Sequence, residues 1–179
     1  MCEMCDGKSG EQVRREFLGR IAKHDYTMVS VEAERARDGS WVAPGFVYSV
    51  GLWGFHRAPE LIVVGAPARN GAGLVEKYAE WVKAGRRFYP GAYPHFIEGV
   101  PVVLEPVAPA LYREWFARAF DFYPQGEFRA LQLLWPDRQG AWPWEPRWQT
   151  QVVPQPVLTP TGRPQGAGRK RGEKESRFL

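Results

Sequence analysis

The sequence has no long apolar run. Its longest apolar stretches, at residues 61–65 and 100–104, are about five residues long, whereas a helix needs about 20 mostly apolar residues to cross a bilayer. We therefore expect no membrane span and no membrane partner. Residues 2–16 are polar almost throughout and lack the apolar stretch of a secretory signal, so the sequence predicts a cytoplasmic protein.

Familiar catalytic and repeat signatures are also missing. The sequence contains no Gly-x-Ser-x-Gly elbow, no Walker phosphate-binding loop and no Rossmann fingerprint. The hydrolases, nucleotide triphosphatases and dinucleotide-binding proteins that carry those motifs therefore have no direct support. No internal repeat with a period of about 20 to 50 residues is visible, which argues against a solenoid or a propeller.

Cysteine and histidine are scarce, with two and three residues respectively in the chain of 179. Cys2 and Cys5 form a Cys-x-x-Cys pair, but a structural zinc site needs four ligands and no second pair exists. No strand is expected before the pair, which disfavours a thioredoxin-like redox site. Three interpretations stay open: zinc bound together with histidines, a four-thiolate zinc site shared across a homodimer, or two reduced thiols on a flexible end.

The net charge of +4 belongs to the end of the chain. Residues 161–179 contain six basic and two acidic side chains, so the preceding 160 residues balance to zero. Residues 159–179 are rich in glycine and charge and poor in apolar side chains, and we expect a disordered basic tail there. Nucleic acid would be a partner only through this tail, and a solvated extension is the simpler interpretation.

The remaining residues, 1–158, predict a single α+β domain. Its apolar pattern alternates between helical and extended spacing without the regular alternation of a parallel sheet. Expected strands cover residues 26–31, 46–50, 61–64, 100–107 and 128–135. Expected helices run over residues 10–23, from a cap at Asn70 to a stop at Gly85, and onward from Pro109, while residues 32–45 are expected as a loop. This order favours a mainly antiparallel sheet covered by about three helices.

The candidate catalytic residues are His56 and Glu60. They lie in the glycine-containing connection 51–60 between two expected strands, a position from which loops often present functional side chains. A histidine can act as a general base and a nearby carboxylate can orient it. The same composition is also ordinary for a surface turn.

The candidate ligand-binding residues are Tyr48, Arg86, Arg87 and Trp144. The two arginines could hold an anion through their forked donors, or could be the solvated end of a helix. Trp144 belongs to a tryptophan-rich segment, residues 135–148, which predicts either a lid on the core or a surface for stacking a ligand or a protein.

Several short blocks of the sequence resemble one known family. They are Met1-Cys-Glu-Met-Cys-Asp-Gly7, Phe46-Val-Tyr-Ser-Val-Gly-Leu52, Ala58-Pro-Glu-Leu-Ile-Val-Val-Gly65, Gly85-Arg-Arg-Phe88, Arg129-Ala-Leu-Gln-Leu-Leu-Trp-Pro-Asp137 and Gln155-Pro156. In this order and spacing they resemble the bacterial domain of unknown function 4262 family. The resemblance implies one domain over residues 1–158 and implies no reaction.

The sequence therefore leaves three functional hypotheses. The first is a small ligand-binding or regulatory domain with a small-molecule or protein partner. The second is a hydrolase or transferase in which His56 is the general base, Glu60 orients it and an arginine holds an anionic substrate. The third is a zinc-binding protein that uses Cys2 and Cys5.

Overall fold

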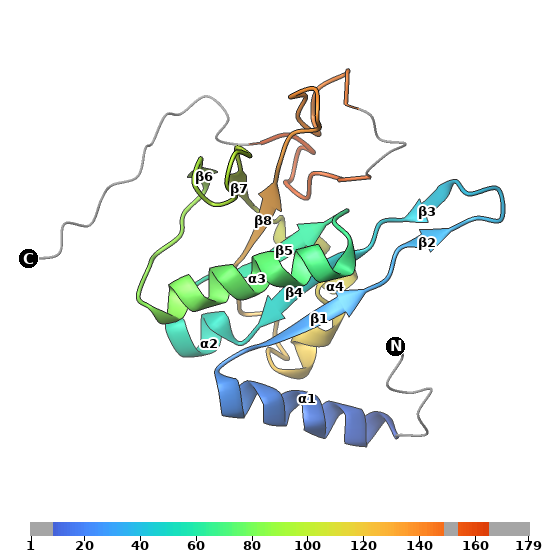
Figure 1. Ribbon diagram of the computed structural model, residues 1–179. Helices are drawn as coiled ribbons and strands as arrows, with labels where there is room; N and C mark the ends of the chain where they lie inside the picture. Colours follow the sequence, from blue (N-terminus) through green and yellow to red (C-terminus); the bar gives the residue numbers. More distant parts are fainter. Residues whose placement is uncertain (1–8, 149–153, 165–179) are drawn as a thin grey trace, which may run out of the picture.

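A six-stranded sheet organises the molecule. The computed structural model describes residues 9–148 and 154–164. The sheet has the order β1-β4-β5-β8-β7-β6, and only the β5–β8 pair is parallel (Figure 1). The strands are β1 (Thr27–Val31), β4 (Phe46–Val50), β5 (Glu60–Val64), β6 (Gly91–Ala92), β7 (Val103–Pro106) and β8 (Ala130–Leu134). The expected α+β class with a mostly antiparallel sheet is confirmed.

Four α-helices lie within the described residues, with two short 3₁₀ helices beside the last of them. The α-helices are α1 (Gly10–His24), α2 (Leu52–His56), α3 (Ala68–Lys83) and α4 (Tyr112–Trp115), and the 3₁₀ helices are Pro109–Leu111 and Ala117–Asp121. In Figure 1, α3 lies across one face of the sheet. The opposite face packs against α1 and the segment 109–123.

The central strands contribute to a hydrophobic core on each face of the sheet. Successive side chains of a strand point to opposite faces, and every residue of β5 and β8 is buried. Leu61 and Val63 therefore pack beneath α3, whereas Ile62 and Val64 pack against α1 and the segment 109–123. Strands buried on both faces read as continuous apolar runs, which is why these two were visible in the sequence.

The first helix follows the predicted pattern. Ser9 accepts a hydrogen bond from the Gln12 backbone N–H, and the Gln12 side chain accepts one from the Ser9 backbone, which completes a capping box. Val13, Phe17 and Ile21 are buried at helical spacing along one face. The expected helix over residues 10–23 is confirmed, with its end one residue later.

The expected loop over residues 32–45 is wrong. This segment forms an antiparallel hairpin of β2 (Glu34–Arg35) and β3 (Trp41–Ala43), which projects from the sheet in Figure 1. The turn uses Gly39 at a φ of 85°, and the Asp38 carboxylate accepts hydrogen bonds from Ser40. The polar composition concealed the hairpin because most of its side chains are exposed.

Two helix boundaries also differ from the sequence prediction. Helix α3 begins after Pro67 and not after Asn70, since proline suits the start of a helix, where its missing N–H is not needed. The helix expected from Pro109 is broken into the 3₁₀ helix at Pro109–Leu111, α4 and the 3₁₀ helix at Ala117–Asp121. Bulky rings at Tyr112 and Phe116 fix this irregular segment by packing on Phe128.

The segment 154–164 is attached to the sheet by two buried glutamines. Gln132 on β8 donates to the Pro156 carbonyl and accepts from the Leu158 N–H, at 2.7 and 2.8 Å. Gln155 accepts from the Trp135 N–H at 3.2 Å. Leu158 is buried in the second core. Residues 165–179 lie outside the described residues, so the disorder of the tail stays a prediction.

Gly51 has a position that no other residue could occupy without strain. Its φ is 121°, and an added Cβ would lie 2.5 Å from the Asp25 carbonyl oxygen and 2.8 Å from the Tyr26 Cα. We expect Gly51→Ala to lower the free energy of unfolding by at least about 2 kcal/mol, because the clash adds to the backbone strain. Chemical denaturation measures this loss.

Gly73→Ala is the matched control for that substitution. Gly73 lies within α3, and an added Cβ would have no atom within 4 Å. Alanine should stabilise this helix by roughly 0.5–1 kcal/mol relative to glycine. Equal effects at the two positions would contradict the assignment of Gly51 as a conformational requirement.

Candidate functional site

The carboxylate of Glu60 is fully buried and has several hydrogen-bond donors around it. Glu60 begins β5 and its side chain is fully buried. It accepts four hydrogen bonds: from the Ser49 hydroxyl at 2.6 Å, the Gly51 N–H at 2.9 Å, the Trp53 N–H at 3.0 Å and the Tyr123 hydroxyl at 2.7 Å. A buried carboxylate is stable only when such donors replace its lost water.

These bonds hold the short helix α2 in place. Gly51 and Trp53 lie at the amino end of α2, where backbone N–H groups have no partner within a helix. Glu60 supplies that partner from the neighbouring strand. The Tyr123 hydroxyl adds a further link, because it donates to Glu60 and accepts from the Gly54 N–H at 3.1 Å.

Burial also changes the proton affinity of this group. Loss of water raises the pKa of Glu60, and the hydrogen bonds from Ser49, Tyr123 and the two backbone N–H groups oppose that rise. The pKa of Tyr123 is raised as well, by burial first and by the adjacent Glu60 carboxylate second. Tyr123 therefore stays a hydrogen-bond donor.

His56 is not paired with Glu60 in this structure. Its Nε2 atom lies 3.5 Å from the Asp25 carboxylate, and its backbone carbonyl accepts from Arg87 Nη1 at 2.7 Å. The described contacts of Glu60 do not include His56. Asp25 ends α1 with a φ of 68°, and no sequence signal had linked it to residue 56.

The predicted ligand-binding residues do not meet in one place. Tyr48 is buried in the core with its hydroxyl accepting from the Arg118 N–H, and burial raises the pKa of this phenol to about 12. The Arg86 guanidinium lies over the Trp81 ring at 4.6 Å. Arg87 donates a hydrogen bond to the backbone carbonyl of His56, the last residue of α2. Their roles in binding stay predictions.

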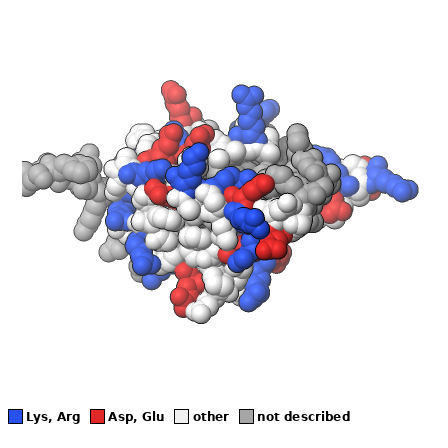
Figure 2. Space-filling model, turned by 90° about the horizontal axis from the view of Figure 1, so that it is seen from below, with Lys and Arg blue, Asp and Glu red and all other residues white. Residues whose placement is uncertain are grey.

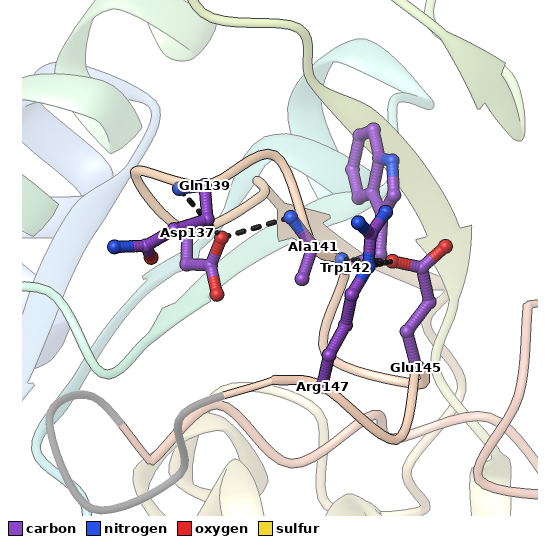
Figure 3. A network of polar contacts seen from close by, with 6 residues as sticks. All are labelled: Asp137, Gln139, Ala141, Trp142, Glu145 and Arg147. Atoms are coloured by element: carbon purple, nitrogen blue, oxygen red, sulfur yellow. Dashed lines mark hydrogen bonds and ion pairs between the residues drawn. The ribbon is translucent and has the colours of Figure 1, made fainter.

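Trp144 belongs to a loop that is ordered by its own hydrogen bonds. Asp137 accepts from the backbone of Gln139 and Ala141, while Glu145 accepts from the Trp142 N–H and lies 3.4 Å from Arg147 (Figure 3). The Trp142 and Trp144 rings are stacked with centroids 4.9 Å apart. Both rings are half-buried. The choice between a core lid and a stacking surface stays a prediction.

An open cavity of about 510 Å³ lies at the carboxyl end of β5. The root of the β2–β3 hairpin and the start of α3 form its walls, which include Trp41, Gly65 and Ala68. None of the four predicted ligand-binding residues is among its described lining. The sequence could not reveal this cavity because its walls come from segments that meet only in the folded chain.

Helix α2 presents one aromatic ring, that of Phe55, to solvent. Phe55 is 49% exposed and stacks on Phe122, with ring centroids 6.2 Å apart. Trp53, two residues earlier on α2, is half-buried against the second core and lies beneath the guanidinium of Arg129. We call Trp53, Phe55 and Phe122 the aromatic surface. Sequence reasoning missed it because Phe122 comes from a distant segment.

The structure contains no membrane helix or metal cluster in its described part. No described helix is both long and apolar enough to cross a bilayer. Across residues 9–148 and 154–164, no three histidine, cysteine, aspartate or glutamate side chains gather in a way that could hold a metal ion. Cys2 and Cys5 lie outside the described residues, so their proposed zinc site stays a prediction.

The structure is an α+β domain in which the buried Glu60 carboxylate holds α2 in place. Helix α2 carries the half-exposed Phe55 ring. Residues 20–149 match the family described as domain of unknown function (DUF4262). The chain belongs to this family, and the resemblance noted in the sequence is confirmed. No curated protein and no solved structure gives a significant match to the chain.

Removing the Glu60 carboxylate should test its structural role. Glu60→Ala leaves four donors without an acceptor, and we expect a loss of about 3–5 kcal/mol in the free energy of unfolding. Glu60→Gln should cost less, because an amide oxygen can accept from Gly51, Trp53 and Tyr123 while the amide nitrogen donates to Ser49. Equal losses in denaturation experiments would contradict this account.

The raised pKa of Glu60 also predicts how stability changes with pH. Below the ordinary carboxyl pKa of about 4.3, the group is protonated in both folded and unfolded chains. As the pH rises toward the folded-state pKa, the unfolded chain loses its proton first, which favours unfolding. We therefore compare the free energy of unfolding of wild type with that of Glu60→Gln. The wild-type value should fall relative to that of the variant across this pH range and then level off. A difference that rises with pH would contradict the prediction.

Proposed function

We propose that this chain is a non-catalytic binding domain that recognises another protein through the aromatic surface of Trp53, Phe55 and Phe122. One observation carries the proposal: a fully buried carboxylate with four hydrogen bonds fixes a short helix that presents the half-exposed Phe55 ring to solvent. The proposal develops the binding-domain hypothesis that the sequence suggested and gives it a location.

The first argument concerns the stability of α2. A helix of five residues cannot be stable alone, because nucleation costs more than its few hydrogen bonds return. Glu60 and Tyr123 anchor the backbone N–H groups of residues 51, 53 and 54 from outside the helix. The exposed Phe55 ring is consequently held on a well-anchored backbone. A preorganised surface loses less conformational entropy when it binds.

The second argument concerns composition and shape. Tryptophan, other aromatic residues and arginine are enriched at the energetic centres of protein interfaces. The aromatic surface has this composition, with Arg129 over the Trp53 ring at 5.5 Å. It also lies outside the cavity at the end of β5. An exposed turn of this kind suits a protein partner better than a small molecule, which needs an enclosing site.

The hydrolase or transferase alternative has weaker support. The Glu60 side chain is out of reach of solvent, and its oxygens already accept four hydrogen bonds. It is thus poorly placed to orient His56 or to meet a substrate. A catalytic role for His56 would have to depend on Asp25, which lies 3.5 Å from its Nε2 atom.

Selection of binding peptides tests the proposal without a known partner. We would select peptides from a displayed random library on the immobilised wild-type protein, and then measure their affinity for Phe55→Ala. Removal of the exposed ring should weaken binding at least about tenfold. The thermal midpoint of this variant should stay close to that of wild type, because half of the Phe55 side chain is exposed.

Two further variants complete the experiment. Val42→Ala changes another exposed apolar residue, on β3, and should leave affinity unchanged. Trp41→Ala changes the wall of the cavity. Peptides that bind Phe55→Ala as tightly as wild type, but lose affinity for Trp41→Ala, would move the binding site to the cavity and overturn the proposal.

A further inference from the structure

Three arginines contact or directly follow α2, the helix that carries Trp53 and Phe55. Arg57 follows α2 directly in a left-handed conformation and is exposed. The guanidinium of Arg87 is held at the α2 carbonyl of His56, at 2.7 Å. The guanidinium of Arg129 lies over the Trp53 ring. Arg87 and Arg129 are therefore held by contacts with α2, and the backbone of Arg57 continues directly from it.

Three of the acidic groups near this surface are already neutralised or buried. Asp121, next to Phe122, lies 2.8 Å from Arg118 and 3.5 Å from Arg14. Asp25 lies near both His56 and Lys83. Glu60 is buried. By contrast, Arg57 and Arg129 form no ion pair within the described residues. One exposed carboxylate, that of Glu127, lies two residues before Arg129, so the arginines beside α2 outnumber it.

We infer that the partner of the aromatic surface is an acidic protein segment that also carries an apolar side chain. The inference rests on the proposed function. The apolar side chain of the segment would pack on Phe55 and Phe122, and its carboxylates would pair with Arg57 and Arg129. Arginine matches carboxylates through two parallel hydrogen bonds, which gives both affinity and orientation. Complementary charge would also speed the encounter.

A nucleic acid is a poorer fit for the same groups. The first 160 residues have no net charge, and Figure 2 shows acidic and basic side chains interspersed on the face that it presents. A polyanion draws its affinity from many phosphate contacts. It would meet the acidic residues of this mixed surface as well as the basic ones. A short segment with a few carboxylates needs only the local positive charge around α2.

The test compares two labelled synthetic peptides of equal length in fluorescence anisotropy with the full chain. One contains glutamate, aspartate, leucine and phenylalanine, and the other has lysine and arginine in place of the acidic residues. We expect only the acidic peptide to bind, with an affinity that falls as salt increases. The double variant R57A/R129A should bind it at least about tenfold more weakly. Arg37→Ala, an exposed arginine on the β2–β3 hairpin, is the matched control and should bind normally.

Other outcomes would overturn the inference in distinguishable ways. If peptides selected from the library require Phe55 but are basic or neutral, the proposed function stands and the acidic partner is wrong. If the acidic peptide binds Phe55→Ala and R57A/R129A as tightly as wild type, both are wrong. If a single-stranded oligonucleotide displaces the acidic peptide and shows the same dependence on Phe55, Arg57 and Arg129, the partner is a nucleic acid and the inference fails.

Discussion

The buried carboxylate of Glu60 is the interaction on which the centre of this structure depends. It joins the start of β5, the end of β4, the amino end of α2 and the distant Tyr123 through four hydrogen bonds. Neutral apolar residues could fill the same space. They could not, however, accept hydrogen bonds from the backbone N–H groups of the short helix that connects β4 and β5. The polar network therefore specifies one geometry for residues 51–60, at the expense of placing a carboxylate in a region of low polarity.

That geometry connects the core to the molecular surface. Inside, the α2 connection lies against Asp25 and Tyr26 so closely that position 51 accepts only glycine. Outside, the same connection carries Phe55, which stacks on Phe122, and leads directly into Arg57. An interface built on such a turn would need little rearrangement on binding. The same constrained connection thus supports the half-exposed Phe55 side chain.

The sequence predicted the regular parts of the fold well. The capping box at Ser9, the apolar runs of β5 and β8 and the amphipathic stripe of α3 are local patterns, and each formed the expected element. The β2–β3 hairpin and the broken helix after Pro109 were missed, because exposed side chains carry little apolar periodicity and because ring packing on Phe128 overrides helical propensity. For the site, the catalytic roles of His56 and Glu60 stay predictions, and the structure adds contacts that the sequence did not suggest: Glu60 contacts Tyr123, and His56 lies near Asp25.

By itself the sequence determined the α+β class, the membership of a family and the placement of net charge at the end of the chain, because composition and local periodicity encode these properties directly. Only the tertiary structure decided the role of Glu60, since its partners lie up to 63 residues away along the chain. The same holds for the aromatic surface and the cavity at β5. Each joins segments whose proximity is set by strand order and core packing, and a linear pattern does not record which distant residues will become neighbours.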